Sequence, residues 1–179
     1  GWATASSPTE RRLWSVDLLA SDDGWAVGQG GIILHWDGVR WAEVPSPTVK
    51  HLTAVDLVSS GDGWAVGSDG TIFHFDGADW TQTRSPTQLH LESVDMLTTD
   101  DGWAVGWGFG GSAESSSLIG TILHWDGTGW TEVASSARWR PEAVAAVSGD
   151  DAWVAGDVGP MLRWDGSSWS EAPGAAGLL

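Results

Sequence analysis

The sequence predicts an all-β fold, a β-propeller array of four four-stranded antiparallel blades with an extra N-terminal outer strand. Three observations lead to this fold class. Three elements recur in the same order three times: a Gly-Trp-Ala-Val-Gly run, an Ile-x-His run followed by Asp-Gly, and a later Trp. A fourth copy keeps mainly the tryptophans. The first tryptophans of the three copies, Trp25, Trp64 and Trp103, are 39 residues apart. Several short apolar runs divide each copy, and a period near 40 built from such runs is typical of propeller blades.

The first strand of each blade, strand A, is predicted from apolar positions spaced by two. Val16, Val55, Val94 and Val144 occupy one equivalent position, and a second apolar residue follows two residues later in copies one to three. A spacing of two is the period of a β-strand. The predicted A strands are Leu13–Leu19, Leu52–Val58, Leu91–Leu97 and Ala143–Val147.

Three further strands complete each predicted blade. Strand B is the Gly-Trp-Ala-Val-Gly run, strand C is the Ile-x-His run, and strand D begins at the last Trp of the copy. Asp-Gly between strands C and D predicts a two-residue type I′ turn. Acidic and small residues between A and B, such as Ser21-Asp22-Asp23, predict a second turn. Ser46-Pro47-Thr48 follows strand D and ends it, so the next strand A begins a new sheet.

The copies divide the chain into one array over residues 1–179. Blade 1 is predicted over 10–50, blade 2 over 51–88, blade 3 over 89–138 with an insertion at 107–118, and blade 4 over 139–179. Residues 1–9 align with a D strand and predict a lone outer strand, which makes five D strands for four blades. This surplus leaves two alternatives: an excised piece of a longer array, or a chain that completes an eight-blade ring with a second chain. Free blade edges are prone to associate, so self-association through them is expected.

Composition excludes several classes of function. The formal net charge of −16 disfavours nucleic acid and anionic membrane surfaces as partners, because phosphate contacts need clustered Lys and Arg. The chain has no cysteine, so disulfides and thiolate chemistry are excluded. No apolar run approaches the ~20 residues that span a bilayer. We expect no cofactor and no metal, and we expect a bacterial protein that is secreted or otherwise extracytoplasmic.

Asp101-Gly-Trp-Ala-Val-Gly106, followed by Gly120-Thr-Ile-Leu-His-Trp-Asp-Gly-Thr-Gly-Trp130, resembles bacterial propeller repeats. The resemblance is to repeats related to the sialidase Asp-box type and to the photosystem II stability and assembly factor propellers. The spacing departs from the Asp-box, because Asp126 and Trp130 are one residue closer. Sialidase activity in that family needs a Tyr nucleophile, and this chain contains no Tyr. The assembly factors would imply protein binding without chemistry.

Residues that break the repeat are candidates for binding. Strand direction puts the D–A and B–C connections at one end of the blades, which we call the loop face, and the A–B and C–D turns at the other, the hairpin face. The insertion at 107–118 lies between B and C of copy three and should project from the loop face as a Gly/Ser-rich loop. Its Trp107 and Phe109 are candidate ligand contacts, because exposed loops on rigid scaffolds often carry binding. The alternative is a tolerated surface insertion with Trp107 packed on a neighbouring blade.

Positive groups also recur on the loop face, just before each strand A. A ring of cations there could hold an anion or an acidic segment of a partner, or the cations could simply neutralise carboxylates such as Glu92 and Glu142. The candidate residues are Arg12, His51, His90 and Arg140, with the neighbouring aromatic residues Trp14 and Trp139. Aspartates gather instead at the hairpin face, where turn capping is favoured over a calcium site because no spaced calcium loop is present.

A second pattern suggests buried Asp–His pairs. Asp17, Asp56 and Asp95 lie in strand A of the three copies that carry His35, His74 and His124 in strand C. Copy four has Ala145 and Arg163 at these positions, so both residues change together. An unpaired buried carboxylate is costly, which predicts a direct Asp–His interaction with a structural role.

These patterns predict a non-enzymatic binding or assembly module. Its partner is expected to be a protein or a glycan that is recognised through the loop face around residues 107–118. The alternative is a structural subunit, joined to other chains by strand exchange into a closed ring or filament. No nucleophile, base and orienting residue stand together outside the repeat, so an enzyme is not expected.

Overall fold

The computed structural model describes residues 6–112, 115–133, 140–157 and 160–172. Sixteen strands form four separate antiparallel sheets, and two short 3₁₀ turns, η1 (Gln29–Gly31) and η2 (Ser68–Gly70), are the described helical segments. This confirms the predicted all-β fold of four four-stranded blades. The extra strand at 1–9 is not established, because residues 1–5 lie outside the described part and residues 6–9 have no strand assignment.

Each blade is a meander in which every strand pairs with its sequence neighbour. The strands of blade 1 are β1 (Leu13–Ala20), β2 (Asp23–Gly28), β3 (Ile33–Trp36) and β4 (Trp41–Glu43). Blade 2 contains β5 (Leu52–Ser59), β6 (Asp62–Gly67), β7 (Ile72–Phe75) and β8 (Trp80–Gln82). Blade 3 contains β9 (His90–Thr98), β10 (Asp101–Ser112), β11 (Ser115–Trp125) and β12 (Trp130–Val133). Blade 4 contains β13 (Pro141–Ser148), β14 (Asp151–Gly156), β15 (Leu162–Trp164) and β16 (Trp169–Glu171).

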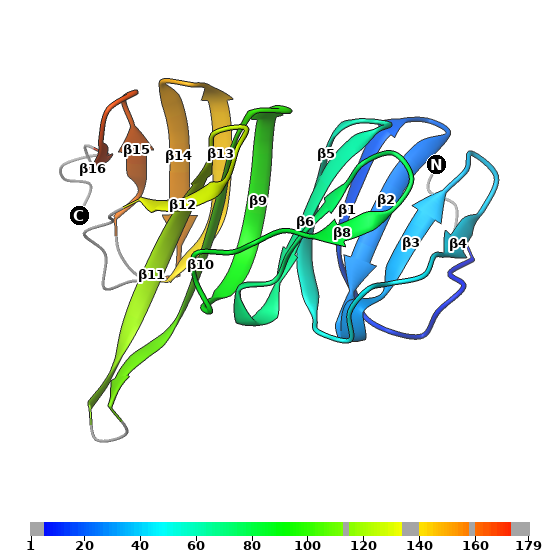
Figure 1. The fold of residues 1–179 in the computed structure, drawn as a ribbon, viewed down its shortest axis with the longest axis horizontal. Coiled ribbons are helices and arrows are strands. Elements are labelled where there is room, and N and C mark those ends of the chain that lie inside the picture. The colour runs from blue at the N-terminus through cyan, green and yellow to red at the C-terminus, as the bar shows by residue number, and fades with distance from the viewer. Residues whose placement is uncertain (1–5, 113–114, 134–139, 158–159, 173–179) are drawn as a thin grey trace, which may run out of the picture.

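The first strands of the blades, β1, β5, β9 and β13, contact one another in succession along the array. Blades 1 and 4 therefore lie at its two ends (Figure 1). The apolar core consists mainly of three clusters, one at each junction between consecutive blades. Each sheet thus buries both faces where it has a neighbour on each side, which explains why the B strands are apolar at successive positions.

A tryptophan from each B strand fills the junction with the next blade. Trp64 is 1% exposed, and its ring lies 4.7 Å from Trp125 and 5.4 Å from Trp130 of blade 3. Trp25 makes the same contacts with Phe75 and Trp80 of blade 2, and Trp103 with Trp164 and Trp169 of blade 4. Edge-to-face packing of this kind adds to the area that the rings bury. The repeated tryptophans are therefore mainly junction residues.

The hairpins between strands C and D differ from the predicted two-residue turn. β3 ends at Trp36 and β4 begins at Trp41, so four residues connect them. Within this loop only Gly38 has a positive φ, 86°, whereas a type I′ turn needs two such residues. The Asp37 carboxylate accepts hydrogen bonds from the backbone N–H groups of Val39 and Arg40 at 2.9 and 2.8 Å. This side-chain cap replaces the tight turn, and Asp76, Asp126 and Asp165 repeat it.

Candidate functional site

The insertion of blade 3 is a β-ribbon, which corrects the prediction of a loop. β10 and β11 continue their pairing from Gly106↔Thr121 out to Ser112↔Ser115, and the ribbon projects beyond the blade (Figure 1). Small Gly and Ser residues do not prevent pairing here, because the two arms are in register with the strands that they extend. The ribbon emerges from the loop face, at the B–C connection, as strand direction requires. Phe109 on its β10 arm is 68% exposed.

Trp107, at the base of the ribbon, is held by residues of blades 3 and 4. Its indole N–H donates to the Glu92 carboxylate at 2.7 Å. The Arg140 guanidinium lies 4.0 Å from the ring centroid, and Phe109 meets the ring edge-on at 5.9 Å. A cation over an aromatic ring is an attractive contact. Trp107 therefore anchors the ribbon to blade 4. This matches the alternative predicted from the sequence, in which Trp107 packs on a neighbouring blade.

The predicted cations of the loop face lie beside carboxylates. Arg140 pairs with Asp157 at 3.0 Å and with Glu142 at 3.4 Å, and His90 lies 3.6 Å from Glu92. His90 and the N–H of Trp107 lower the pKa of Glu92, so this carboxyl group stays ionised. The loop face around blades 3 and 4 therefore carries paired charges of both signs.

His51 and Arg12 occupy the equivalent places on blades 2 and 1. The Nδ1 atom of His51 accepts a hydrogen bond from the N–H of Gly30 at 2.9 Å. Arg12 is exposed, and its carbonyl oxygen accepts from the N–H of Gln29 at 2.8 Å. Trp139 lies outside the described residues.

A hollow of about 410 Å³ opens between the first strands of blades 1, 2 and 3. Its lining brings together three of the candidate binding residues, the carboxylate that the sequence analysis named as their neighbour, and one residue that it did not consider: Trp14, His51 and His90, with Glu92 and Thr53. Trp14 is 45% exposed and meets His51 edge-on at 5.1 Å. The hollow thus has both an accessible indole and an ionised carboxylate in its lining.

The predicted Asp–His pairs were wrong. His35, His74 and His124 contact the aspartate that begins strand B of their own blade: Asp23, Asp62 and Asp101, at 3.2, 2.8 and 2.8 Å. Strand B lies between strands A and C in every sheet, so the A-strand aspartate and the C-strand histidine are separated by the Trp of strand B. In blade 4, Arg163 pairs with Asp151 at 2.9 Å in the same way. Each of the four described blades therefore contains this acid–base pair. Its His or Arg side chain also packs against the ring of the tryptophan in strand B of the same blade.

The A-strand aspartates instead join consecutive blades. The Asp17 carboxylate accepts from the N–H of Leu57 in blade 2 at 2.9 Å, and Asp56 accepts from Met96 in blade 3 at 2.7 Å. Asp95 accepts from Ala146 in blade 4 at 2.6 Å. Burial, with smaller contributions from the charges of Asp95 and Asp17, raises the pKa of Asp56 to about 6 against the lowering effect of the hydrogen bond from Met96. Burial also raises the pKa of Asp95.

Carboxylates at the hairpin face are occupied by turn contacts. Asp100 accepts from the Thr98 hydroxyl at 2.6 Å, and Asp150 accepts from the Ser148 hydroxyl at 2.6 Å. Within the described ranges, no group of three or more His or acidic residues is arranged to hold a metal ion. In the same ranges, no helix is long and apolar enough to cross a membrane.

No family model matches the chain, and a search of the curated proteins also finds no match. Solved structures resemble it. The extracellular domain of the putative hybrid two-component system BT3049 from B. thetaiotaomicron has a TM-score of 0.67 at 12% identity, and the match covers 93% of this chain but 25% of that one. The WD40 β-propeller domain of Doa1 has a TM-score of 0.52 at 11% identity, over 89% of this chain and 67% of that one. The fold is that of a β-propeller.

A third structure, described as YCF48 bound to D1 peptide, has a TM-score of 0.48 at 15% identity, and covers 92% of this chain and 69% of that one. At such identities the likeness concerns the fold alone. This chain spans a quarter of the BT3049 domain that it matches. The relation to propellers that the sequence indicated is therefore shown at the level of architecture.

Proposed function

We propose that this chain is a non-enzymatic binding module that recognises a protein segment through its loop face. The observation that supports this proposal most is the hollow between blades 1, 2 and 3, which is lined by exposed Trp14 and ionised Glu92; the exposed Phe109 lies on the ribbon of the same loop face. Aromatic anchors beside a charged group are the composition of a typical protein-binding hot spot. Propellers present such surfaces on a rigid scaffold, which fits a binding role.

Charge favours a basic segment as the partner. The chain carries a formal net charge of −16, and the cations of the loop face already have acidic neighbours. A segment that contains an apolar residue and a Lys or Arg would place the apolar residue against Trp14 and the cation against Glu92. Complementary charge would also speed association at low salt.

A glycan is the less favoured partner. Sugar binding by stacking needs an open aromatic face. One face of Trp107 is covered by Arg140, and its edge meets Phe109. The proposal therefore puts the aromatic contact at Trp14 and Phe109 and gives Trp107 a supporting role.

A synthetic peptide array of graded net charge tests the proposal, with a glycan array in parallel. We expect basic peptides that contain an apolar residue to bind, and Trp14→Ala and Phe109→Ala each to weaken binding about 30-fold, as hot-spot truncations do. Val39→Ala is the matched control, because Val39 is 84% exposed in a hairpin between strands C and D. Binding to glycans alone, or equal losses in all three variants, would refute the proposal.

The second candidate is a structural subunit that joins other chains into a ring or filament. Its supporting observation is an uncovered apolar side of blade 1, where Leu13, Val16 and Leu18 are 40%, 55% and 52% exposed. Patches of this kind on a single chain mark interaction surfaces. We also propose, from the resemblance to Asp-box-type repeats of secreted bacterial propellers, that the chain works outside the cytoplasm, which fractionation of the producing cells would test.

A further inference from the structure

The side of blade 1 that points away from blade 2 has the residue types of a blade junction, and none of the other three described sheets packs against it. Leu13, Val16 and Leu18 of β1 are 40%, 55% and 52% exposed, whereas their counterparts 39 residues later in blade 2 are 0%, 5% and 9% exposed. The residue types are the same, so the difference comes from the neighbour: blade 1 covers blade 2, and no described residue covers blade 1 to the same extent. We call this surface the entry face; it comprises the exposed Leu13, Val16 and Leu18 with the partly buried Trp36 and Trp41, and Leu34 lies beneath it at 1% exposure.

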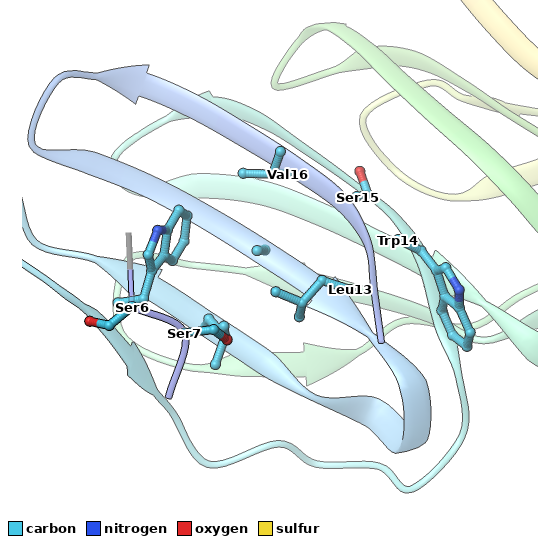
Figure 2. A pocket seen from close by; sticks show the side chains of 9 residues that line it. Ser6, Ser7, Leu13, Trp14, Ser15 and Val16 are labelled. Carbon is cyan, nitrogen blue, oxygen red and sulfur yellow. The ribbon is translucent and has the colours of Figure 1, made fainter. Parts of the chain in front are cut away.

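A cavity of about 330 Å³ lies in the entry face. It is lined largely by apolar groups, among them Leu13, Val16, Leu34 and Trp41. Figure 2 shows Leu13 and Val16 beside this cavity with Ser6 and Ser7 nearby, while Trp14 lies apart from them. Trp36 and Trp41 pack together at 5.6 Å, as Trp125 and Trp130 do in blade 3 at 5.8 Å.

The internal junctions show what fills such a surface. The Trp of strand B in one blade enters the aromatic pair of the next blade: Trp64, for example, contacts both Trp125 and Trp130. Two aliphatic residues from strands B and C accompany it, Val66 and Ile72 in blade 2. Every junction thus consists of one protruding tryptophan with two apolar neighbours on one blade, and a receiving pair of rings on the next.

Blade 4 presents the protruding half of this junction at the other end of the array. Trp153 occupies the position of Trp64, and Ala155 and Met161 occupy those of Val66 and Ile72. Trp153 is only partly buried and Met161 is 50% exposed. Arg163 lies 5.4 Å over the Trp153 ring and pairs with Asp151, so the tryptophan is supported as in the other blades. We call Trp153, Ala155 and Met161 the exit face.

The polar groups of the two end faces also match. At internal junctions an A-strand aspartate accepts from a backbone N–H of the next blade, as Asp17 does from Leu57. The equivalent N–H on the entry face belongs to Leu18, and it already donates to Asp17 Oδ1 at 2.9 Å. The equivalent aspartate on the exit face is replaced by Ala145. At this position a contact between the two faces would therefore leave neither the N–H of Leu18 unpaired nor a carboxylate buried without a partner, both of which are costly.

We propose that the entry face binds the exit face of a second copy of this chain, with Trp153 of one copy seated between Leu13, Val16 and Trp41 of the other. This inference deepens the second candidate function and does not depend on peptide binding at the loop face. The contact joins unlike faces, so two copies close into one ring if the blade rotation allows it, and a filament forms if it does not. It replaces strand exchange as the mode of association, because each described blade already has four strands of its own.

The oligomeric state of the purified chain tests this proposal, measured by analytical ultracentrifugation over a range of concentrations. We expect a dimer, or a ladder of larger species, and Trp153→Ala and Val16→Glu should each raise the dissociation constant at least about 30-fold. Val39→Glu introduces the same charge at an exposed site of blade 1 and should leave the mass distribution unchanged. A wild-type monomer at every concentration would overturn the proposal, as would equal effects of Val16→Glu and Val39→Glu.

Mixing the two interface variants gives a second test of the contact, which applies even if one variant fails to associate for another reason. Val16→Glu retains an intact exit face and Trp153→Ala retains an intact entry face, so the mixture should form a one-to-one complex that neither variant forms by itself. Absence of this complex, with both variants folded by circular dichroism, would refute the pairing of these two faces. Trp14→Ala should not change the mass, so a failure of the loop-face proposal remains distinguishable from a failure of this one.

Discussion

The carboxyl group of Asp56 makes the stability of the array depend on pH in a direction opposite to that of most acidic residues. Burial between blades 2 and 3 raises its pKa from 3.8 to about 6, with further contributions from the charges of Asp95 and Asp17. Between these two values the folded chain binds more protons than the unfolded chain. The contribution of Asp56 to the free energy of unfolding therefore rises as the pH falls through 6, and it is lost as the pH rises.

The magnitude follows from the two pKa values. A shift of about two units corresponds to about 3 kcal/mol when the transition is complete, and to about 2 kcal/mol between pH 7.5 and 4.5. Asp56 is only partly buried, so solvent screening reduces this to about 1 kcal/mol. Asp56→Asn keeps an oxygen that can accept from the N–H of Met96 but cannot ionise. We expect it to gain stability relative to the wild type by about this amount when the pH is raised from 4.5 to 7.5.

Urea unfolding of both proteins at the two pH values measures this difference. Asp76→Asn is the matched control in the same blade: hydrogen bonds from the backbone of Asp79 and Ala78 lower the pKa of Asp76, so its stabilising contribution is lost on acidification. The contribution of Asp76 is lost below about pH 4, outside the range from 4.5 to 7.5, so Asp76→Asn should show almost no change in stability relative to the wild type between these two pH values, whereas Asp56→Asn should gain stability. A stability difference between Asp56→Asn and the wild type that does not vary with pH would refute the reasoning.

Three further predictions concern packing and pairing. Trp64→Ala should cost about 3–5 kcal/mol of unfolding free energy by chemical denaturation because it empties a junction, whereas Trp14→Ala, at an exposed site, should cost far less. Gly67→Ala should destabilise by about 2 kcal/mol, because the new Cβ would clash with the His51 carbonyl oxygen, while Gly129→Ala, with open space around it, should be nearly neutral by the same chemical denaturation. A double-mutant cycle on Asp62 and His74 should give a coupling energy of about 0.5 kcal/mol or more, and a cycle on Asp56 and His74 should give a value near zero.

The strands and their order could be predicted because they depend on local patterns. Alternation with a period of two, turn residues between the runs and a 39-residue repeat all act over a few residues or recur at a fixed spacing. The loop face was predicted for the same reason: the direction of each strand follows from the meander. Residues such as His51, His90 and Arg140 could therefore be assigned to one end of the blades from the amino-acid sequence alone.

The partners of individual side chains could not be predicted in this way. Asp17 and His35 vary together across the copies, but correlated change does not reveal which group each one touches. The central strand separates them, so Asp23 pairs with His35, and Asp17 reaches the next blade. The signal that could have found these contacts is the same 12-residue spacing from Asp23 to His35, from Asp62 to His74 and from Asp151 to Arg163.

The sequence by itself determined the number of blades and the order of their strands, because each copy repeats the same pattern of apolar and turn residues. Only the tertiary structure decided which equivalent positions are covered. Val16 and Val55 are the same residue at the same place in a blade, yet one is 55% and the other 5% exposed. Burial depends on the neighbouring sheet, so the same residue in two equivalent copies is covered or exposed according to which blades the fold packs against it.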